Sequence, residues 1–370
     1  MIDSLSRRRA QRYGECVLTG LPRAPRCSLG HGAAGVAYFL RRYGSIAGEP
    51  EMLDRAADWV ASAERGIGSA DAFIGHLPVF PDSRAARPTS VLFGEAGVWW
   101  VSAVVHTAVG DDRRVDLATD RFCAIATACP EDVLDVAGGA AGLLLAAAGL
   151  VEQLGDLAPQ QVYAVGEDLA RRLREAATHR ERGSSDPLGW LGAAHGWCGV
   201  AHALLRWCRA TGNRPDRALE ALLASLRVAR LASGAWPRSD DSPEVWPGWC
   251  HGSAGWALLW ALAGEVLGDG ELLALAEPPA VHAVIGRGGG AGLCCGLAGR
   301  AYAALAMHRA TGDSAWLPHA RRLADEAAGY ECGPDFPQHS LWGGDVGVAL
   351  LALDLGEPDR AAMPIYDARR

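Results

Sequence analysis

The sequence feature that most constrains the fold is a Gly-x-x-G motif that occurs seven times and each time opens an apolar stretch. In the first six copies, another glycine lies 13 residues after the second motif glycine. Glycine accounts for 46 of 370 residues, so each such match has a chance of about one in eight, and six together indicate an internal repeat. The motif glycines are Gly32/Gly35, Gly94/Gly97, Gly139/Gly142, Gly196/Gly199, Gly252/Gly255, Gly296/Gly299 and Gly344/Gly347.

The stretches that follow the motifs are hydrophobic nearly all round, which predicts helices buried on every side. Examples are residues 98–109, 200–211, 256–267 and 300–311, each followed by a glycine suited to the left-handed position after a helix. The segments between them carry charge on one face and predict half-buried helices at 51–65, 115–128, 160–178, 216–231 and 315–328. The apolar run 136–151 is too short to span a membrane and predicts a buried helix.

Alternating buried and half-buried helices close most simply into a double ring, so we predict an all-α fold, an α,α-toroid of seven helical hairpins. An open solenoid is the alternative, but it would need polar caps that neither end shows. We divide the chain into an N-terminal segment (1–27), a single toroid (28–358) and a C-terminal tail (359–370). In such a ring all seven motifs face one end of the barrel, around a shared cavity.

Composition excludes several classes of function. The net charge is −8 with no basic block, so we expect no nucleic-acid partner. All 35 basic residues are arginine, which removes Schiff-base chemistry and the phosphate-binding Walker lysine. Residues 1–16 lack the apolar core of a secretory signal, so we expect a cytoplasmic protein without a membrane span. The chain has ten cysteines, and in the reducing cytoplasm they favour metal-binding or catalytic thiols over disulfides.

The residues just before the motifs carry the candidate chemistry. Cys250, Cys294 and Cys295 precede the fifth and sixth motifs at matched repeat positions, and they can converge on one Zn²⁺ with an open fourth position. His195 precedes the fourth motif and is the main candidate for a functional histidine, with His251 and His31 as reserves. If a histidine closed the site, the zinc would be structural instead. We expect Cys198, inside the fourth motif, to be a packing residue.

Asp135 lies four residues before the third motif and is followed by a wholly apolar helix. A carboxylate in that place is poorly solvated unless it faces the cavity. It could equally cap the inner helix, and the sequence leaves these two roles open.

Together these elements resemble the lanthionine synthetase C-like cyclases over essentially the whole chain. The resemblance rests on Asp135 before Gly139-x-x-Gly142, on Ala194-His195-Gly196, on Trp249-Cys250-His251-Gly252 and on Cys294-Cys295-Gly296. It implies zinc ligands at Cys250, Cys294 and Cys295 and an acid–base pair at Asp135 and His195. Two departures stand out: many relatives have Cys-His-Gly at the sixth motif, and some carry an arginine where this chain has Trp246.

The resemblance implies a lanthionine synthetase, an enzyme that adds a peptide's cysteine thiol to dehydroalanine or dehydrobutyrine and forms a thioether ring. Its expected partners are a dehydrated precursor peptide, with leader and core, and a separate dehydratase or kinase/lyase enzyme. Glutathione addition to dehydrated residues is the enzymatic alternative, and a non-catalytic zinc toroid that binds a peptide or scaffolds a partner is the other. A glycosidase would need a second inward carboxylate, and a prenyltransferase would need a basic cluster for diphosphate; neither is evident.

Overall fold

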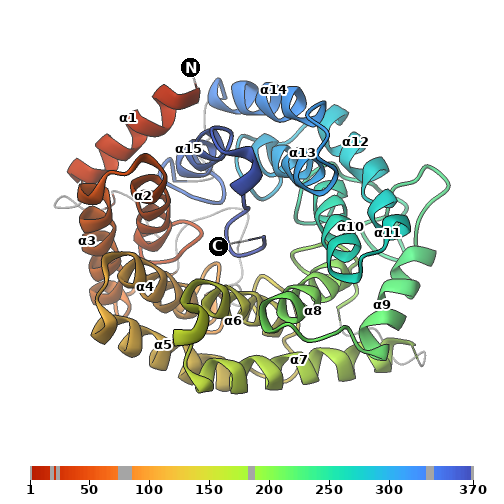
Figure 1. Cartoon of the computed structure of the whole chain (residues 1–370), viewed down its shortest axis with the longest axis horizontal. Coiled ribbons are helices and arrows are strands. Elements are labelled where there is room, and N and C mark those ends of the chain that lie inside the picture. Colours follow the sequence, from red (N-terminus) through yellow and green to blue (C-terminus); the bar gives the residue numbers. More distant parts are fainter. Residues whose placement is uncertain are drawn as a thin grey trace.

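The computed structural model of the chain describes residues 2–16, 21, 26–73, 86–181, 188–330 and 337–367. These residues form helices in two concentric rings, with one isolated β-bridge, between Ser239 and Ser242 (Figure 1). The inner ring consists of the helices that the motifs open: α2 (Ala33–Ala47), α4 (Glu95–Val109), α6 (Ala140–Leu154), α8 (Trp197–Thr211), α10 (Ser253–Leu267), α13 (Leu297–Thr311) and α15 (Asp345–Asp354). The all-α toroid expected from the repeat is therefore confirmed.

The outer ring consists of α1 (Ile2–Glu15), α3 (Pro50–Gly66), α5 (Asp112–Thr127), α7 (Gln160–Glu181), α9 (Arg217–Val228), α11 (Gly270–Ala274) with α12 (Glu277–Ile285), and α14 (Trp316–Ala328). The last inner helix, α15, is followed only by a short 3-10 turn, η4 (Pro358–Arg360), among the described residues. Helix α1 contacts α15 and takes the outer position between α14 and α3 (Figure 1). The N-terminal segment thus completes the last hairpin, a pairing that the order of the repeats does not reveal.

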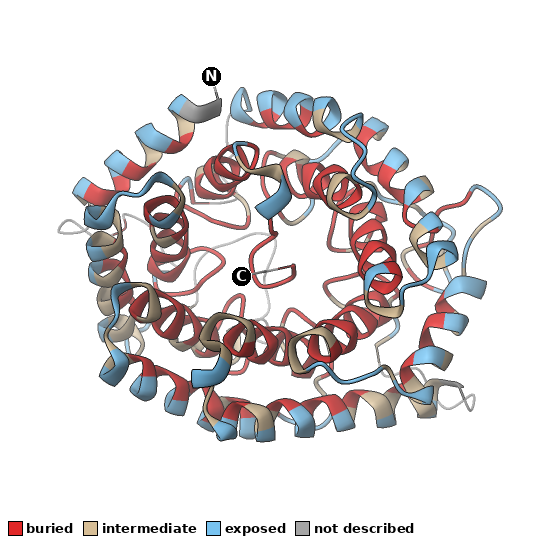
Figure 2. Cartoon of the chain, viewed as in Figure 1, coloured by how far each residue is buried: buried red, intermediate tan, exposed pale blue. Residues whose placement is uncertain are grey.

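Burial follows the predicted division between the rings (Figure 2). The inner helices are buried on nearly all sides, whereas the outer helices bury only the face turned toward the inner ring, and the short α11 has no buried residue. Residues 140–157, which contain α6, are long and apolar enough to cross a membrane, but 67% of this stretch is buried inside the protein. It is a core helix of the inner ring, as the sequence predicts.

Each motif folds the chain back onto the first turn of its inner helix. The first glycine is the N-cap in an extended conformation. In the first, third, fourth, fifth and sixth motifs the next two amides donate to loop carbonyls seven residues earlier, as Ala140 does to Val133. The second glycine is needed because the carbonyl six residues before it lies where a side chain would begin. At Gly97 an added Cβ would lie 1.9 Å from the Val91 oxygen.

Backbone hydrogen bonds join the motif loops into a closed ring. The residue two places before each first glycine (position −2) donates its N–H to the carbonyl of its counterpart in the next loop. Cys250 donates to Cys294 at 3.2 Å, and Trp342, in the last loop, donates to Gly30 in the first at 2.9 Å. The second loop is the exception, because the Ser90 hydroxyl makes the link to Ala137 there at 2.5 Å. This ring fixes the order of the loops around one end of the barrel.

We expect Gly97→Ala to lower the free energy of unfolding by about 3 kcal/mol, because the loop or the helix must move away from the new Cβ. Gly68→Ala is the control, since an added Cβ there meets no atom within 4 Å and its effect should stay within about 0.5 kcal/mol. Urea unfolding of both variants measures the difference. Equal stability of the two would show that the close approach at Gly97 is not a constraint.

Candidate metal and acid–base site

Three cysteine side chains meet at the end of the barrel where the motif loops gather. Cys250 and Cys294 occupy position −2 of the fifth and sixth loops, which are neighbours in the hydrogen-bonded ring, and Cys295 follows directly. The Cys295 sulfur lies 3.0 Å from that of Cys250 and 3.4 Å from that of Cys294. All three sulfurs lie within 4.8 Å of one another. The matched repeat positions predicted from sequence do bring these residues together.

The cluster favours one thiolate at neutral pH. Hydrogen bonds with the sulfurs of Cys250 and Cys294 lower the pKa of Cys295 to about 3, and the nearby imidazoles of His251 and His195 act in the same direction. The pKa of Cys294 is raised well above its ordinary value, chiefly by its hydrogen bond with Cys250. Cys295 is exposed, Cys294 is partly exposed and Cys250 is buried, so Cys295 is the residue of the cluster that solvent reaches most readily.

Asp135 and His195 are in direct contact. One carboxylate oxygen of Asp135 lies 2.6 Å from Nδ1 of His195, and the other accepts the Gly138 N–H at 2.9 Å. The N-cap of α6 is Gly139, not Asp135. With its proton on Nδ1, facing the carboxylate, the imidazole of His195 has Nε2 as its acceptor.

The repeat explains why an aspartate stands here. Asp135 occupies position −4, four residues before the first glycine, where the first, second and seventh loops carry Ser28, Ser90 and Ser340. Each of these serine hydroxyls accepts the N–H three residues later, as one Asp135 oxygen does. A carboxylate performs this structural task and has a second oxygen left for His195. The sequence contains this pattern, although aligning only the two residues before each motif does not reveal it.

Aromatic rings and one arginine extend the site beyond His195. The rings of His195 and His251 are stacked with centroids 5.4 Å apart, and Trp190 lies 5.0 Å from His251. The Arg238 guanidinium lies over Trp190 at 4.7 Å and over Trp246 at 5.1 Å. Burial, followed by the charge of His195, lowers the pKa of His251 to about 4. Aligning only the two residues before each motif misses Trp190 and Arg238, although Trp190 and Trp246 share one repeat position, six residues before the first glycine.

Two other sequence candidates lie apart from the cluster. His31 is buried, its Nδ1 lies 2.7 Å from the Ser340 hydroxyl, and its ring stacks on Phe93 at 5.2 Å. Burial lowers its pKa to about 3, so it is neutral. Cys198 is buried in the first turn of α8, 4.0 Å from the Tyr366 hydroxyl. Neither side chain belongs to the group of three cysteines.

The donor set fits zinc. Among the described residues, Cys250, Cys294 and Cys295 are the one group of three potential ligands whose donor atoms lie within 4.8 Å. Thiolates are soft ligands that suit Zn²⁺, and three of them leave a fourth position for a substrate. The exposed side of the cluster, at Cys295, gives such a position access to solvent.

We expect about one zinc per chain in the wild-type protein and at least about 100-fold weaker binding in Cys295→Ala, because losing a ligand costs more than losing a residue that only supports one. The measurement is zinc content by elemental analysis, followed by competition with a chelator. Cys123→Ala, which removes a buried thiol from α5, is the control and should bind zinc as the wild type does. A wild type without zinc, or a Cys295→Ala variant that binds it equally well, would contradict the assignment.

Comparisons with known proteins show the family and the fold to which this chain belongs. The chain is 26% identical over 372 residues to the zebrafish (Danio rerio) protein named glutathione S-transferase LANCL1, covering 93% of this chain and 86% of that protein. It is 28% identical over 312 residues to LanC-like protein GCL1 of Arabidopsis thaliana, covering 76% and 71%. The solved structure of nisin cyclase matches with a TM-score of 0.71 at 13% identity, covering 96% of this chain and 94% of that one. The family model "Lanthionine synthetase C-like protein" matches residues 24–368, so the chain belongs to the lanthionine synthetase C-like family.

Proposed function

We propose that this protein is a zinc-dependent lanthionine synthetase, which closes thioether rings in a dehydrated ribosomal peptide. The observation that carries the proposal is a cluster of three cysteine sulfurs beside a histidine held by a carboxylate. A similar toroid in nisin cyclase supports the fold, and the residues of this chain support the chemistry.

The reaction joins a cysteine thiol to the alkene of dehydroalanine or dehydrobutyrine. A bond forms between sulfur and Cβ, the alkene electron pair moves to Cα as an enolate, and Cα then takes up a proton. The thiol proton leaves and an equivalent proton returns, so no oxidant or co-reactant is needed. Zinc held by Cys250, Cys294 and Cys295 would supply a Lewis acid that ionises the substrate thiol.

We assign the proton transfers to His195. Its Nε2 accepts the thiol proton, and the imidazolium then donates a proton to Cα on one face of the enolate. Asp135 holds Nδ1–H at 2.6 Å, which fixes the ring orientation and stabilises the imidazolium. This contact supports an orienting role for Asp135 over the alternative that the sequence leaves open, a cap on the inner helix.

The substrate of this reaction is a precursor peptide, with leader and core, whose serines or threonines have already lost water. We propose that a separate dehydratase or kinase/lyase enzyme supplies it and that the reaction takes place in the cytoplasm. Reduced thiols are required both in the substrate and in the site, which fits that compartment.

We expect His195→Ala to slow ring formation by about 10²–10⁴-fold, the usual contribution of a positioned acid–base group. Asp135→Ser should slow it by about 10²-fold, because serine preserves the turn as it does at position −4 of three other loops but has no second oxygen for His195. The measurement is the rate of thiol loss from a dehydrated peptide, followed by alkylation and mass spectrometry.

Both variants should retain zinc and the wild-type unfolding midpoint, since neither residue is a proposed ligand and the turn survives in Asp135→Ser. Full activity in His195→Ala would exclude it as the proton-transfer residue. Full activity in Asp135→Ser would reduce Asp135 to the structural role that serine has in the other loops.

A second candidate is the addition of glutathione to dehydrated residues, which uses the same site with a different thiol. The resemblance to the zebrafish protein favours it, because that protein is named a glutathione S-transferase and the match covers 93% of this chain.

A dehydrated peptide without cysteine, incubated with glutathione, separates the two candidates. For a dedicated cyclase we expect no glutathione adduct above the uncatalysed rate, while the cysteine-containing peptide cyclises without a change in mass. Catalysed growth of the peptide by the mass of glutathione, combined with no ring formation, would replace the cyclase proposal with this second one.

A further inference from the structure

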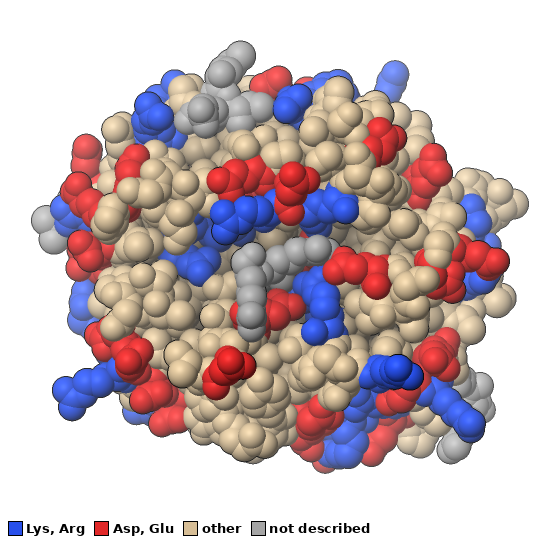
Figure 3. All heavy atoms as spheres, viewed as in Figure 1, with Lys and Arg blue, Asp and Glu red and all other residues tan. Residues whose placement is uncertain are grey.

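The C-terminal segment of the described chain, residues 361–367, lies inside the inner ring. Figure 1 shows the chain turning inward after α15 and η4 and ending in the centre of the toroid. All seven residues are buried. Charged side chains gather around the centre of the face seen in Figure 3. This segment of the chain therefore occupies the centre of the inner ring.

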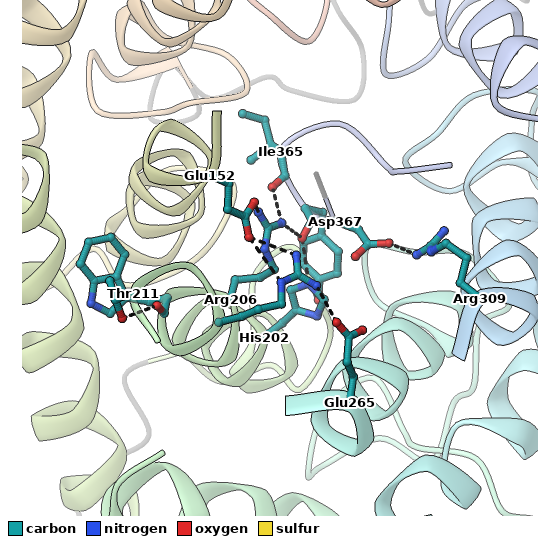
Figure 4. A network of polar contacts seen from close by, with 11 residues as sticks. Glu152, His202, Arg206, Thr211, Glu265, Arg309, Ile365 and Asp367 are labelled. Atoms are coloured by element: carbon teal, nitrogen blue, oxygen red, sulfur yellow. Dashed lines mark hydrogen bonds and ion pairs between the residues drawn. The ribbon is translucent and has the colours of Figure 1, made fainter. Parts of the chain in front are cut away.

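Buried polar side chains of the inner helices hold this segment (Figure 4). Arg206, with no exposed side-chain surface, donates to the Tyr366 carbonyl at 2.9 Å and is paired with Glu152 at 2.6 Å. Arg309 donates to the Ala361 carbonyl at 2.6 Å and is also paired with Asp367. These contacts come from α8 and α13, so the segment is attached at both of its ends.

The backbone of the segment is strained at Ile365. Its φ is 63°, the one positive value among non-glycine residues in the described chain. The Tyr366 N–H donates to the Pro364 carbonyl at 2.6 Å, which makes a γ-turn of the rare form with a positive central φ. A β-branched residue is disfavoured in this conformation, and such strain persists only where surrounding contacts determine it. The turn therefore fixes the direction in which the Tyr366 side chain leaves the backbone.

Tyr366 lies against the loop that carries a metal-site cysteine. Its ring stacks on His202 at 3.8 Å and meets the ring of Trp249 edge-on at 5.1 Å. Trp249 directly precedes Cys250, and the N–H groups of both residues donate to the Cys294 carbonyl, at 3.1 and 3.2 Å. Tyr366 thus contacts the side chain of Trp249, the residue that is next to Cys250 in sequence and hydrogen-bonded to Cys294 through its backbone.

We propose that Tyr366 is a positioning residue for the metal site: the C-terminal segment holds its ring against Trp249, and Trp249 in turn fixes Cys250 relative to Cys294. The proposal rests on the proposed function in taking the cysteine cluster as the zinc site. The polar contacts from α8 and α13 maintain the strained turn, and the strain gives the ring one orientation. Tyr366 acts through Trp249 and needs no contact with substrate.

Tyr366→Leu tests this, because leucine keeps apolar volume in the lumen but lacks the aromatic edge contact. In the metal-free full chain we expect hydrogen exchange at the Trp249 and Cys250 amides to become about 10-fold faster. We expect zinc affinity to fall about 10-fold, in the range known for residues that support metal ligands. The visible absorption spectrum of the Co²⁺-loaded protein should change, since it reports the arrangement of the sulfur ligands.

Tyr38→Leu is the matched control: it removes another buried tyrosine, which stacks on Trp100 at 5.7 Å. It should lower overall stability without changing these three readouts, and Tyr366→Phe should match the wild type in all of them. If Tyr366→Leu does not fold, Asp367→Asn loosens the same segment and should change the readouts in the same direction by a smaller factor.

The proposal would be overturned if Tyr366→Leu matched the wild type in hydrogen exchange, zinc affinity and Co²⁺ spectrum. It would also be overturned if Tyr38→Leu changed these three readouts as much as Tyr366→Leu does. Failure of the proposed function looks different: the wild type would bind zinc without closing rings, while the exchange at Trp249 and Cys250 would still respond to Tyr366→Leu.

Discussion

The structure depends on the hydrogen bonds that join each motif loop to the next, from the backbone N–H at position −2 in every loop but the second, where the Ser90 hydroxyl makes the link. The backbone bonds need no particular side chain, so the side chains at and next to this position are free to vary around a fixed frame. Sequence order becomes spatial order, because these hydrogen bonds join each loop to the loops before and after it in the sequence. Asp135, His195, Cys250 and Cys294 belong to the third to sixth loops and therefore lie consecutively around the barrel end.

Position −4 shows how chemistry is added to this frame. Serine or aspartate there accepts an amide in four loops, and the other three carry glycine because the neighbouring loop approaches too closely for a side chain. A Cβ at Gly192 would lie 2.5 Å from Cα of His251, and one at Gly248 would lie 2.9 Å from Cα of Cys295. The same close approach that excludes a side chain brings His195, His251 and the cysteines into one site.

The centre of the toroid completes this arrangement. Inner helices alone would enclose a lumen, and the returning C-terminal segment fills it with backbone whose carbonyls need partners. Arg206 and His202 supply them, and Glu152 compensates the buried charge of Arg206. A buried ion pair of this kind adds little net stability but destabilises alternatives in which either charge is left unpaired. It therefore defines where the segment, and with it Tyr366, must lie.

The sequence alone determined the repeat, the inner and outer helices and the convergence of Cys250, Cys294 and Cys295. Glycine spacing and hydrophobic pattern are local properties, and a closed ring places the same position of every repeat at the same end of the barrel. Only the tertiary structure decided that α1 completes the last hairpin, that Arg238 lies between Trp190 and Trp246, and that Tyr366 reaches Trp249. These contacts join residues outside the repeat or at opposite ends of the chain. No periodicity encodes them, since they arise when the ring closes and its interior has to be filled.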